Sequence, residues 1–227
     1  MRKITADQMK KIEDKCESIG ISNLILMENA GRGLAEIIVE KFNTILSSNV
    51  LILAGLGNNG GDGFVAARHL AAYGVKSIVV LIEKKSEIKS EIAKSNWKIL
   101  SNLKHSIKIF EVPNINDIPK FESYFNSCGV IVDAIFGTGI KGEIRDSYAA
   151  IIELANRAEA PIIAVDVPSG LDPSTGALNG KVINADITVS FHMKKMGLIG
   201  KERLTGHVIV LPIGIPKDID MLLKKQM

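Results

Sequence analysis

Cysteine and surplus charge are both scarce in this chain of 227 residues. It has only two cysteines, Cys16 and Cys128, and their spacing matches neither a zinc knuckle nor a disulfide framework. We expect both to be buried, reduced thiols. The formal net charge is only +3, from 28 basic and 25 acidic residues. No basic run with interleaved aromatic residues is present, so nothing in the composition argues for a nucleic-acid partner.

Long apolar runs are also missing. No segment is apolar for long enough to span a bilayer, and the N-terminal stretch Met1–Gln8 lacks the apolar core of a signal peptide. We therefore expect a cytoplasmic protein with no membrane partner. The phosphate-loop pattern G-x-x-x-x-G-K-[ST] is absent, which argues against an ATPase of that type. The G-x-S-x-G pattern of serine hydrolases is absent as well, and the four histidines show no metal-ligand spacing.

What the chain does have is a glycine-rich stretch, Gly55–Gly63, between an apolar run and an amphipathic run. That order predicts a strand, a loop and a helix. The N-terminus of such a helix suits an anion, because its N–H groups are unpaired and its dipole end is positive. The spacing Gly55-x-Gly57-x-x-Gly60 fits the dinucleotide-binding pattern. Asn58, Asn59 and Asp62 add amides and a carboxylate that a phosphate cradle does not need. The alternative is a tight turn that uses Asn and Asp as turn formers.

The rest of the chain alternates between predicted strands and helices. Its apolar runs are continuous, as in strands covered on both faces, and right-handed crossovers then give a parallel arrangement. We predict an α/β fold: a doubly wound, mostly parallel Rossmann-like sheet with helices on both faces and two N-terminal helices packed on it as an extension. No linker or repeat divides the chain, so residues 1–227 are predicted to form one domain. The predicted strands are Val50–Ala54, Ser77–Ile82, Ser106–Val112, Val130–Ala134, Ile162–Val165, Ile187–Phe191 and His207–Leu211. The predicted helices are Gly63–Tyr73, Glu87–Leu103, Ile115–Phe125, Ser147–Ala158 and Lys217–Leu223.

The two N-terminal helices have distinct signatures. Thr5–Gln8 is a capping box, and the first helix should place Met9, Ile12, Cys16 and Ile19 on one face. The second helix is predicted from Asn23 to Phe42, with Leu24 in its apolar set. Gly31 and Gly33 inside it cost about 1 kcal/mol each relative to alanine. Close approach of a ligand or another backbone would offset that cost, and an ordinary crossing of two packed helices is the alternative.

Polar, glycine-rich loops follow three of the predicted strands: Gly55–Gly63, Asp133–Glu143 and Asp166–Gly176. In sheets of this kind ligands bind at the carboxyl ends of the strands, so we expect the three loops to converge. Each brings a carboxylate, namely Asp62, Asp133 or Asp166. Glu83 follows the second strand, where a ribose-binding acid would lie in a dinucleotide fold, but we predict that it is a surface residue. His69 is predicted to be a capping or packing residue.

With these loops in place, the chain resembles the NAD(P)H-hydrate epimerase family, also called the YjeF N-terminal domain type. The resemblance rests on segments in the family's order that span most of the chain: Leu26–Gly31, Gly55–Gly63 with Ala67–Leu70, Val132–Gly139, Asp166–Gly170 with Thr175–Gly176, and Lys195–Leu198. One departure is Lys194, where the family usually has proline. The resemblance implies the form of the protein that is not fused to a dehydratase.

The resemblance implies an isomerase that interconverts the R and S forms of NADH or NADPH hydrated at C6. A separate, stereospecific dehydratase would then repair both forms. It also implies one K⁺ per subunit, a homodimer, and the following site residues. Substrate-binding residues are Asn58, Asn59, Gly60, Gly61, Asp62, Gly137, Thr138, Gly139, Ile140, Lys141, Gly142, Glu143 and Asp166. Metal ligands are Asn59, Asp133 and Ser169.

Inverting the C6 carbinolamine requires proton transfer to and from its oxygen, with loss of water or ring opening. A positioned carboxylate contributes ~10²–10⁴-fold to such a step. We predict Asp133 as the catalytic base and Asp166 as the second candidate, with Lys195 as a further alternative if Asp133 is mainly a cation ligand. Two other functions stay open. One is a non-catalytic nucleotide-binding or protein-interaction module on the same fold. The other is a nicotinamide dehydrogenase, for which the chain has no second substrate domain.

Overall fold

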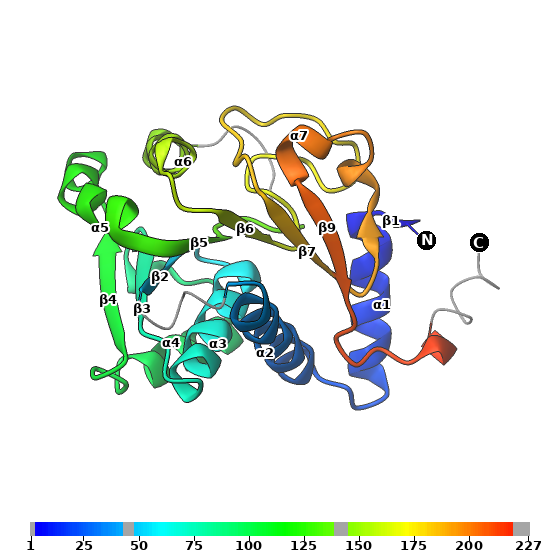
Figure 1. Ribbon diagram of the computed structural model, residues 1–227. Coiled ribbons are helices and arrows are strands. Elements are labelled where there is room, and N and C mark those ends of the chain that lie inside the picture. Colours follow the sequence, from blue (N-terminus) through cyan, green and yellow to red (C-terminus); the bar gives the residue numbers. More distant parts are fainter. Residues whose placement is uncertain (1–2, 43–47, 139–144, 220–227) are drawn as a thin grey trace.

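The computed structural model describes residues 3–42, 48–138 and 145–219. A seven-stranded sheet in the order β4-β3-β2-β5-β6-β7-β9 forms the centre of the molecule (Figure 1). All its neighbouring strands within the described residues are parallel. The strands are β2 (Asn49–Ala54), β3 (Ser77–Ile82), β4 (Ile107–Val112), β5 (Cys128–Ala134), β6 (Ile162–Val165), β7 (Ile187–Phe191) and β9 (His207–Leu211). The predicted strands match these within two residues, and the order confirms the doubly wound fold.

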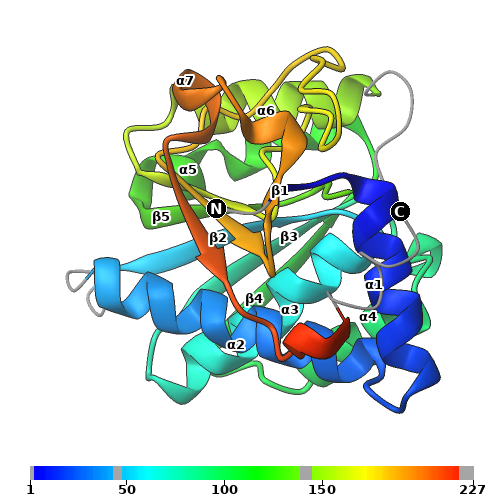
Figure 2. The same cartoon turned by 90° about the vertical axis from the view of Figure 1, so that its right-hand side faces the viewer.

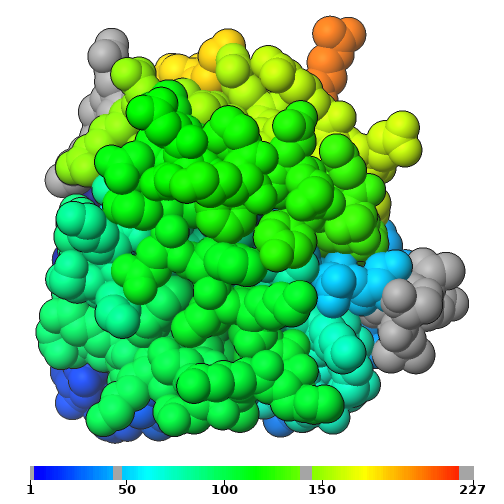
Figure 3. Space-filling view, turned by 90° about the vertical axis from the view of Figure 1, so that its left-hand side faces the viewer, coloured from blue at the N-terminus to red at the C-terminus, as the bar shows by residue number. Residues whose placement is uncertain are grey.

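Helices cover both faces of the sheet. Those on one face are α2 (Asn23–Lys41), α3 (Asn58–Ala72) and α4 (Glu91–Leu100), and those on the other are α5 (Glu122–Ser127) and α6 (Asp146–Arg157) (Figure 1). Single-turn and 3₁₀ elements complete the chain: η2 (Lys85–Glu87), η3 (Ile115–Phe121), η4 (Met196–Leu198) and α7 (Glu202–Thr205). Figure 3 shows the side of the molecule whose surface comes from the middle of the chain, around β4 and α5. No helix among the described residues has the length and apolar character needed to cross a membrane.

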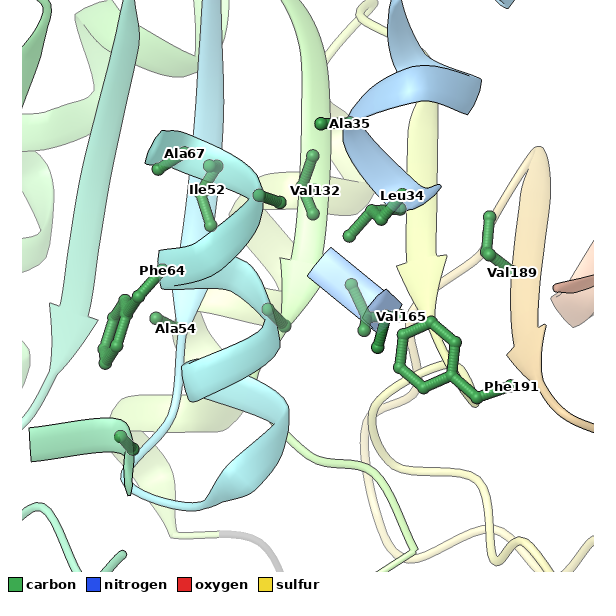
Figure 4. Close-up of a cluster of buried hydrophobic side chains, with 14 of the residues drawn as sticks. Leu34, Ala35, Ile52, Ala54, Phe64, Ala67, Val132, Val165, Val189 and Phe191 are labelled. Atoms are coloured by element: carbon green, nitrogen blue, oxygen red, sulfur yellow. The ribbon is translucent and has the colours of Figure 1, made fainter. Parts of the chain in front are cut away.

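The central strand β2 shows why the sheet needs a layer of helices on each face. Its alternate residues point to opposite faces. Ile52 and Ala54 belong to the core under α2, α3 and α4, whereas Leu51 and Leu53 belong to the core under α5 and α6. All four side chains are fully buried, and burying a leucine or isoleucine contributes roughly 1.5–3 kcal/mol. Figure 4 shows the first of these cores.

The N-terminal helices differ in part from the prediction. α1 (Ala6–Ser18) begins at the predicted capping box: Thr5 Oγ1 accepts from the Gln8 amide at 3.2 Å, and the Gln8 side chain accepts from the Thr5 amide at 3.0 Å. The helix ends before Ile19, which is 52% exposed rather than part of the apolar face. α2 packs directly beside α3 as a layer of the fold rather than as an extension. Leu24 is 51% exposed, so its predicted core position is wrong.

Close packing explains the two glycines within α2. A Cβ at Gly31 would lie 2.5 Å from Val65 Cβ and 2.8 Å from the Asp62 carbonyl oxygen, both on α3. A Cβ at Gly33 would lie 2.7 Å from the side chain of Leu211 on β9. Close packing therefore offsets the helix cost of both glycines: Gly31 lies at the predicted crossing of two packed helices, whereas Gly33 packs against a strand side chain.

A second, small sheet was not predicted. β1 (Lys3–Ile4) pairs in parallel with β8 (Lys194–Lys195), and Ile4 stands opposite Lys195. α1 follows β1 and lies along the side of the molecule shown in Figure 2. A two-residue pairing between distant parts of the chain has no hydrophobic period, which is why the sequence pattern does not reveal it. The pairing fixes the start of α1 next to Lys195.

Candidate active site

The three polar segments meet where the strand order reverses, between β2 and β5. A Cβ at Gly55 would lie 2.0 Å from the Ile135 carbonyl oxygen, and one at Gly60 would lie 2.1 Å from the Gly55 carbonyl oxygen. A Cβ at Gly137 would lie 2.9 Å from Asn59 Oδ1. These glycines therefore allow contacts that no other residue type would allow. The convergence expected from the parallel fold is confirmed for the described residues.

The loop after β2 is shorter than predicted. α3 begins at Asn58 rather than at Gly63, so the predicted site residues Asn58, Asn59, Gly60, Gly61 and Asp62 form its first turns. The N-cap residue, Gly57, provides no side-chain hydrogen bond. The first N–H groups of α3 therefore remain available to an anion at this end of the helix. The predicted start of this helix was wrong because glycine has a low helix propensity. In the folded protein, close packing requires glycine at these positions.

Asp133 and Ser169 form a buried hydrogen-bonded pair. Asp133 is the penultimate residue of β5 and has no exposed surface, and Ser169 is 1% exposed. Asp133 Oδ2 accepts from the Ser169 amide at 2.7 Å, and Oδ1 accepts from Ser169 Oγ at 2.5 Å and from the Ile135 amide at 3.3 Å. Ser169 Oγ in turn accepts from the Phe136 amide at 2.9 Å. The pair thus joins the loops after β5 and β6.

The Asp133 carboxylate has no cationic partner within the described residues. Burial raises the pKa of Asp133 to about 6, even though hydrogen bonds from Ser169 and Ile135 act to lower it. A buried carboxylate without a counter-charge is costly, and a bound cation would remove that cost.

Asn59 brings an amide oxygen to the same region. The residue is 8% exposed, and among the described residues its side-chain nitrogen, a donor, is buried without a hydrogen-bond partner. Its Oδ1 faces Gly137, next to the Phe136 amide that binds Ser169. Amide, hydroxyl and carboxylate oxygens suit a hard cation, and a single carboxylate suits one of low charge. The predicted ligands Asn59, Asp133 and Ser169 therefore fit a monovalent cation. No cluster of three His, Cys, Asp or Glu side chains able to hold a metal occurs in the described ranges.

Asp166 follows β6 in a left-handed conformation with φ of 66°. A non-glycine residue held there is strained, and such strain is characteristic of functional sites. Its Oδ1 accepts from the Phe191 amide at 3.0 Å and from the ammonium group of Lys195. The Lys195 side chain is fully buried and also donates to the Phe191 carbonyl oxygen at 2.7 Å. Oδ2 of Asp166 has no hydrogen-bond partner among the residues described, so it is available to a ligand.

A cavity of about 70 Å³ opens beside Asp166. Its polar lining comprises Glu13, Asn23, Asn58, Asp62, Asp166 and Lys195. Burial, followed by repulsion from Asp166 and Glu13, raises the pKa of Asp62 well above its ordinary value. The sequence analysis did not identify Glu13, because a single glutamate on an amphipathic helix looks like part of a solvated face.

The remaining predicted residues are placed as follows. Gly137 and Thr138 lie in the loop after β5, whereas Gly139, Ile140, Lys141, Gly142 and Glu143 lie outside the described residues. Glu83 is not the surface residue predicted: its side chain is 13% exposed, and Arg145 lies 3.5 Å away.

His69 ties two helices together. Its Nε2 lies 2.8 Å from Glu28 Oε1 on α2, and Arg68 binds the other oxygen of the same carboxylate. These contacts confirm the predicted packing role of His69.

This chain is similar to a known protein family, to curated relatives and to a solved structure. The family model described as YjeF-related protein N-terminus matches residues 23–197. An NAD(P)H-hydrate epimerase of Nitrosopumilus maritimus is 43% identical over 96% of this chain and 97% of that protein. A bifunctional NAD(P)H-hydrate repair enzyme of Pyrobaculum aerophilum is 40% identical over 98% of this chain, which spans 44% of the longer protein. The crystal structure of yeast YNL200c has a TM-score of 0.78 and 27% identity, covering 92% of this chain and 87% of the yeast chain.

Proposed function

This chain belongs to the family of YjeF-related protein N-termini, and from that premise we propose that it is an NAD(P)H-hydrate epimerase. It interconverts the R and S forms of C6-hydrated NADH and NADPH and so serves the repair of these nucleotides. The observation that carries the proposal is the near-complete coverage, in both directions, of a relative with that activity in its name. We assign the dehydration step to a dehydratase that acts as the functional partner, and the bifunctional repair enzymes among the relatives support that assignment.

The site chemistry suits a hydrated dinucleotide. The uncapped N-terminus of α3 provides N–H groups for the pyrophosphate. Asn58, Asn59, Gly60, Gly61 and Asp62, with Gly137 and Thr138, line the substrate in this proposal. The ring is then held beside the carboxylates that follow β5 and β6.

We assign proton transfer to Asp166 rather than to Asp133, the first choice from the sequence. Asp133 has no exposed surface, and both its oxygens already accept hydrogen bonds. Asp166 lines the cavity and keeps Oδ2 free while Lys195 and Phe191 hold Oδ1. This arrangement presents one oxygen to a water or to the C6 hydroxyl in a fixed orientation. Lys195 is a positioning residue, since its ammonium group already donates hydrogen bonds to the Asp166 carboxylate and the Phe191 carbonyl oxygen.

We further propose that Asn59, Asp133 and Ser169 hold one K⁺ per subunit. When bound, the ion supplies a positive charge that balances Asp133 and attracts the substrate phosphates. The unbalanced, buried charge of Asp133 supports this assignment. Exposed apolar residues Ile19, Leu24 and Ile25 at the junction of α1 and α2 support a homodimer. Sedimentation at several protein concentrations tests that assembly.

The experiment for the proposed function starts from a single purified hydrate epimer and follows its partner by chromatography. Wild-type protein is expected to produce the second epimer far faster than the buffer control. Asp166→Asn is expected to lose at least ~10²-fold in kcat, the contribution of a positioned acid or base. A flat trace with folded wild-type protein would leave the non-catalytic nucleotide-binding or interaction module as the better interpretation. Wild-type kcat in Asp166→Asn would remove Asp166 from the mechanism.

A further inference from the structure

Glu13 on α1 belongs to the same cavity as the site carboxylates but lies outside the segment that matches the family model. Two contacts fix its position. Ile4 pairs with Lys195 across β1 and β8, and the Ala6 amide at the start of α1 donates to Ser174 Oγ at 3.0 Å. The helix that carries Glu13 is thus anchored to the strand that carries Lys195. The cavity of about 70 Å³ is large enough for a few waters or for the hydroxyl edge of a ring.

The burial of Asp62 without a partner indicates that a ligand enters this cavity. Its side chain lines the cavity and is only 9% exposed. In the part of the chain that the structure describes, its carboxyl group has neither a hydrogen-bond nor an ion-pair partner. Buried polar groups are nearly always paired, so an unpaired carboxyl facing a cavity indicates a group that enters it.

The charges around the cavity do not balance. Three carboxyl groups, Glu13, Asp62 and Asp166, line it together with a single ammonium group, Lys195, and that ammonium group binds Asp166. Burial and the charge of Asp166 raise the pKa of Glu13, against the opposing effects of Lys195 and Lys10, and Asp14 on the same helix adds a small rise. Burial also raises the pKa of Asp62. Negative charges around one cavity favour the protonated forms of Glu13 and Asp62.

We propose that Glu13 is a catalytic residue of the epimerisation: from its place beside Asp62 in the cavity lining it donates a proton to the C6 hydroxyl, while Asp166 accepts a proton on return. The proposal rests on the proposed function. In the first half, the carboxyl proton moves to the C6 oxygen, the C6–O bond breaks, and water leaves. The N1 lone pair then forms the N1=C6 double bond. In the second half, water adds to the other face of C6, the electron pair returns to N1, and Asp166 takes the released proton. Cavity water returns that proton to Glu13.

A purely structural role for Glu13 is the competing explanation, but the contacts do not favour it. Within the described residues, Glu13 forms no hydrogen bond or ion pair that would hold α1 in place. The anchors of α1 are the β1–β8 pairing, the Ser174 contact and the buried residues Met9, Ile12 and Cys16.

The test compares Glu13→Gln with Asp14→Asn, a neighbouring carboxylate on the same helix whose side chain is 64% exposed. Glu13→Gln is expected to lower kcat by at least ~10²-fold, the scale of general acid catalysis, with KM changed less than twofold. Since a proton donor must be protonated, wild-type kcat falls as pH rises through the pKa of Glu13. That alkaline limb is expected to vanish in Glu13→Gln, persist in Asp14→Asn and be partly restored in Glu13→Asp.

The outcomes separate the two proposals. A wild-type protein that does not interconvert the epimers refutes the proposed function. An active wild type combined with a Glu13→Gln variant that retains wild-type kcat and an unchanged pH profile refutes the role of Glu13 alone. A Glu13→Gln defect that appears only in KM, with the alkaline limb intact, also overturns proton donation. Circular dichroism of each variant confirms that the fold is retained, and Glu13→Asp provides the second comparison.

Discussion

The substitution Ser169→Ala tests the buried network between the loops after β5 and β6. It removes the hydroxyl that donates to Asp133 Oδ1 at 2.5 Å and accepts from the Phe136 amide at 2.9 Å. A hydrogen bond to a charged group contributes about 1.5–3 kcal/mol, and a buried amide left unpaired costs about 1–3 kcal/mol. We therefore expect a loss of about 2.5–6 kcal/mol in the free energy of unfolding. For a domain of this size that corresponds to a Tm decrease of about 5–24 °C.

The matched control is Ser190→Ala, since Ser190 is equally buried and its hydroxyl donates one bond, to the Met193 carbonyl oxygen at 3.1 Å. Losing one neutral hydrogen bond costs about 0.5–1.5 kcal/mol, so its Tm should fall by about 1–6 °C. Both variants are unfolded thermally and in urea, in potassium-free buffer so that a bound cation does not mask the network.

The pH dependence supplies an independent check. The folded-state pKa of Asp133 is about 6, above its ordinary value of 3.8. A carboxyl pKa raised by folding stabilises the fold at low pH, and that contribution is lost as pH rises from 3.8 through 6. The Ser169 hydroxyl stabilises the charged form, so its removal should cost more at pH 8 than at pH 5. A Ser169→Ala defect no larger than that of Ser190→Ala, or equal at both pH values, would refute this reasoning.

Two further predictions concern the cation and the glycines. Wild-type protein at pH 8 should gain thermal stability with added K⁺ more than with Li⁺. Asp133→Asn should abolish this gain as well as K⁺-dependent turnover, whereas Asp166→Asn should keep the K⁺ stabilisation; a full response in Asp133→Asn would disprove the assigned ligands. Gly60→Ala should lower Tm strongly and impair activity because its Cβ would lie 2.1 Å from the Gly55 carbonyl oxygen, while Gly57→Ala, which has open space and a negative φ, serves as the control. Equal Tm values for the two glycine variants would contradict the packing argument.

The sheet could be predicted because its signal is local. Ile78–Ile82 is apolar without interruption, and that run alone predicts a strand buried on both faces. The rule that strand ends converge then predicts that the three polar loops meet before any contact is known. Hydrophobic period was sufficient for these features, whereas the choice of Asn59, Asp133 and Ser169 within the loops came from the family resemblance.

What the sequence could not predict depends on contacts between distant residues. Helix propensity predicted too late a start for α3, because the packing of Gly60 against Gly55 is seen only in the folded structure. The roles of Asp133 and Asp166 depend on which carboxylate has a free oxygen, and no spacing rule encodes that. Glu13 reaches the cavity through contacts between distant residues, among them the short pairing of β1 with β8.

The pairing of Ile4 with Lys195 has a consequence for biosynthesis. The ribosome synthesises β1 long before β8, so β1 remains unpaired while nearly all of the central sheet is translated. The carboxylates of α1 and α3 are present early, but the ammonium group that binds Asp166 emerges from the exit tunnel near the end. A nascent chain arrested before residue 195 should therefore hold most of its sheet yet lack a competent catalytic centre.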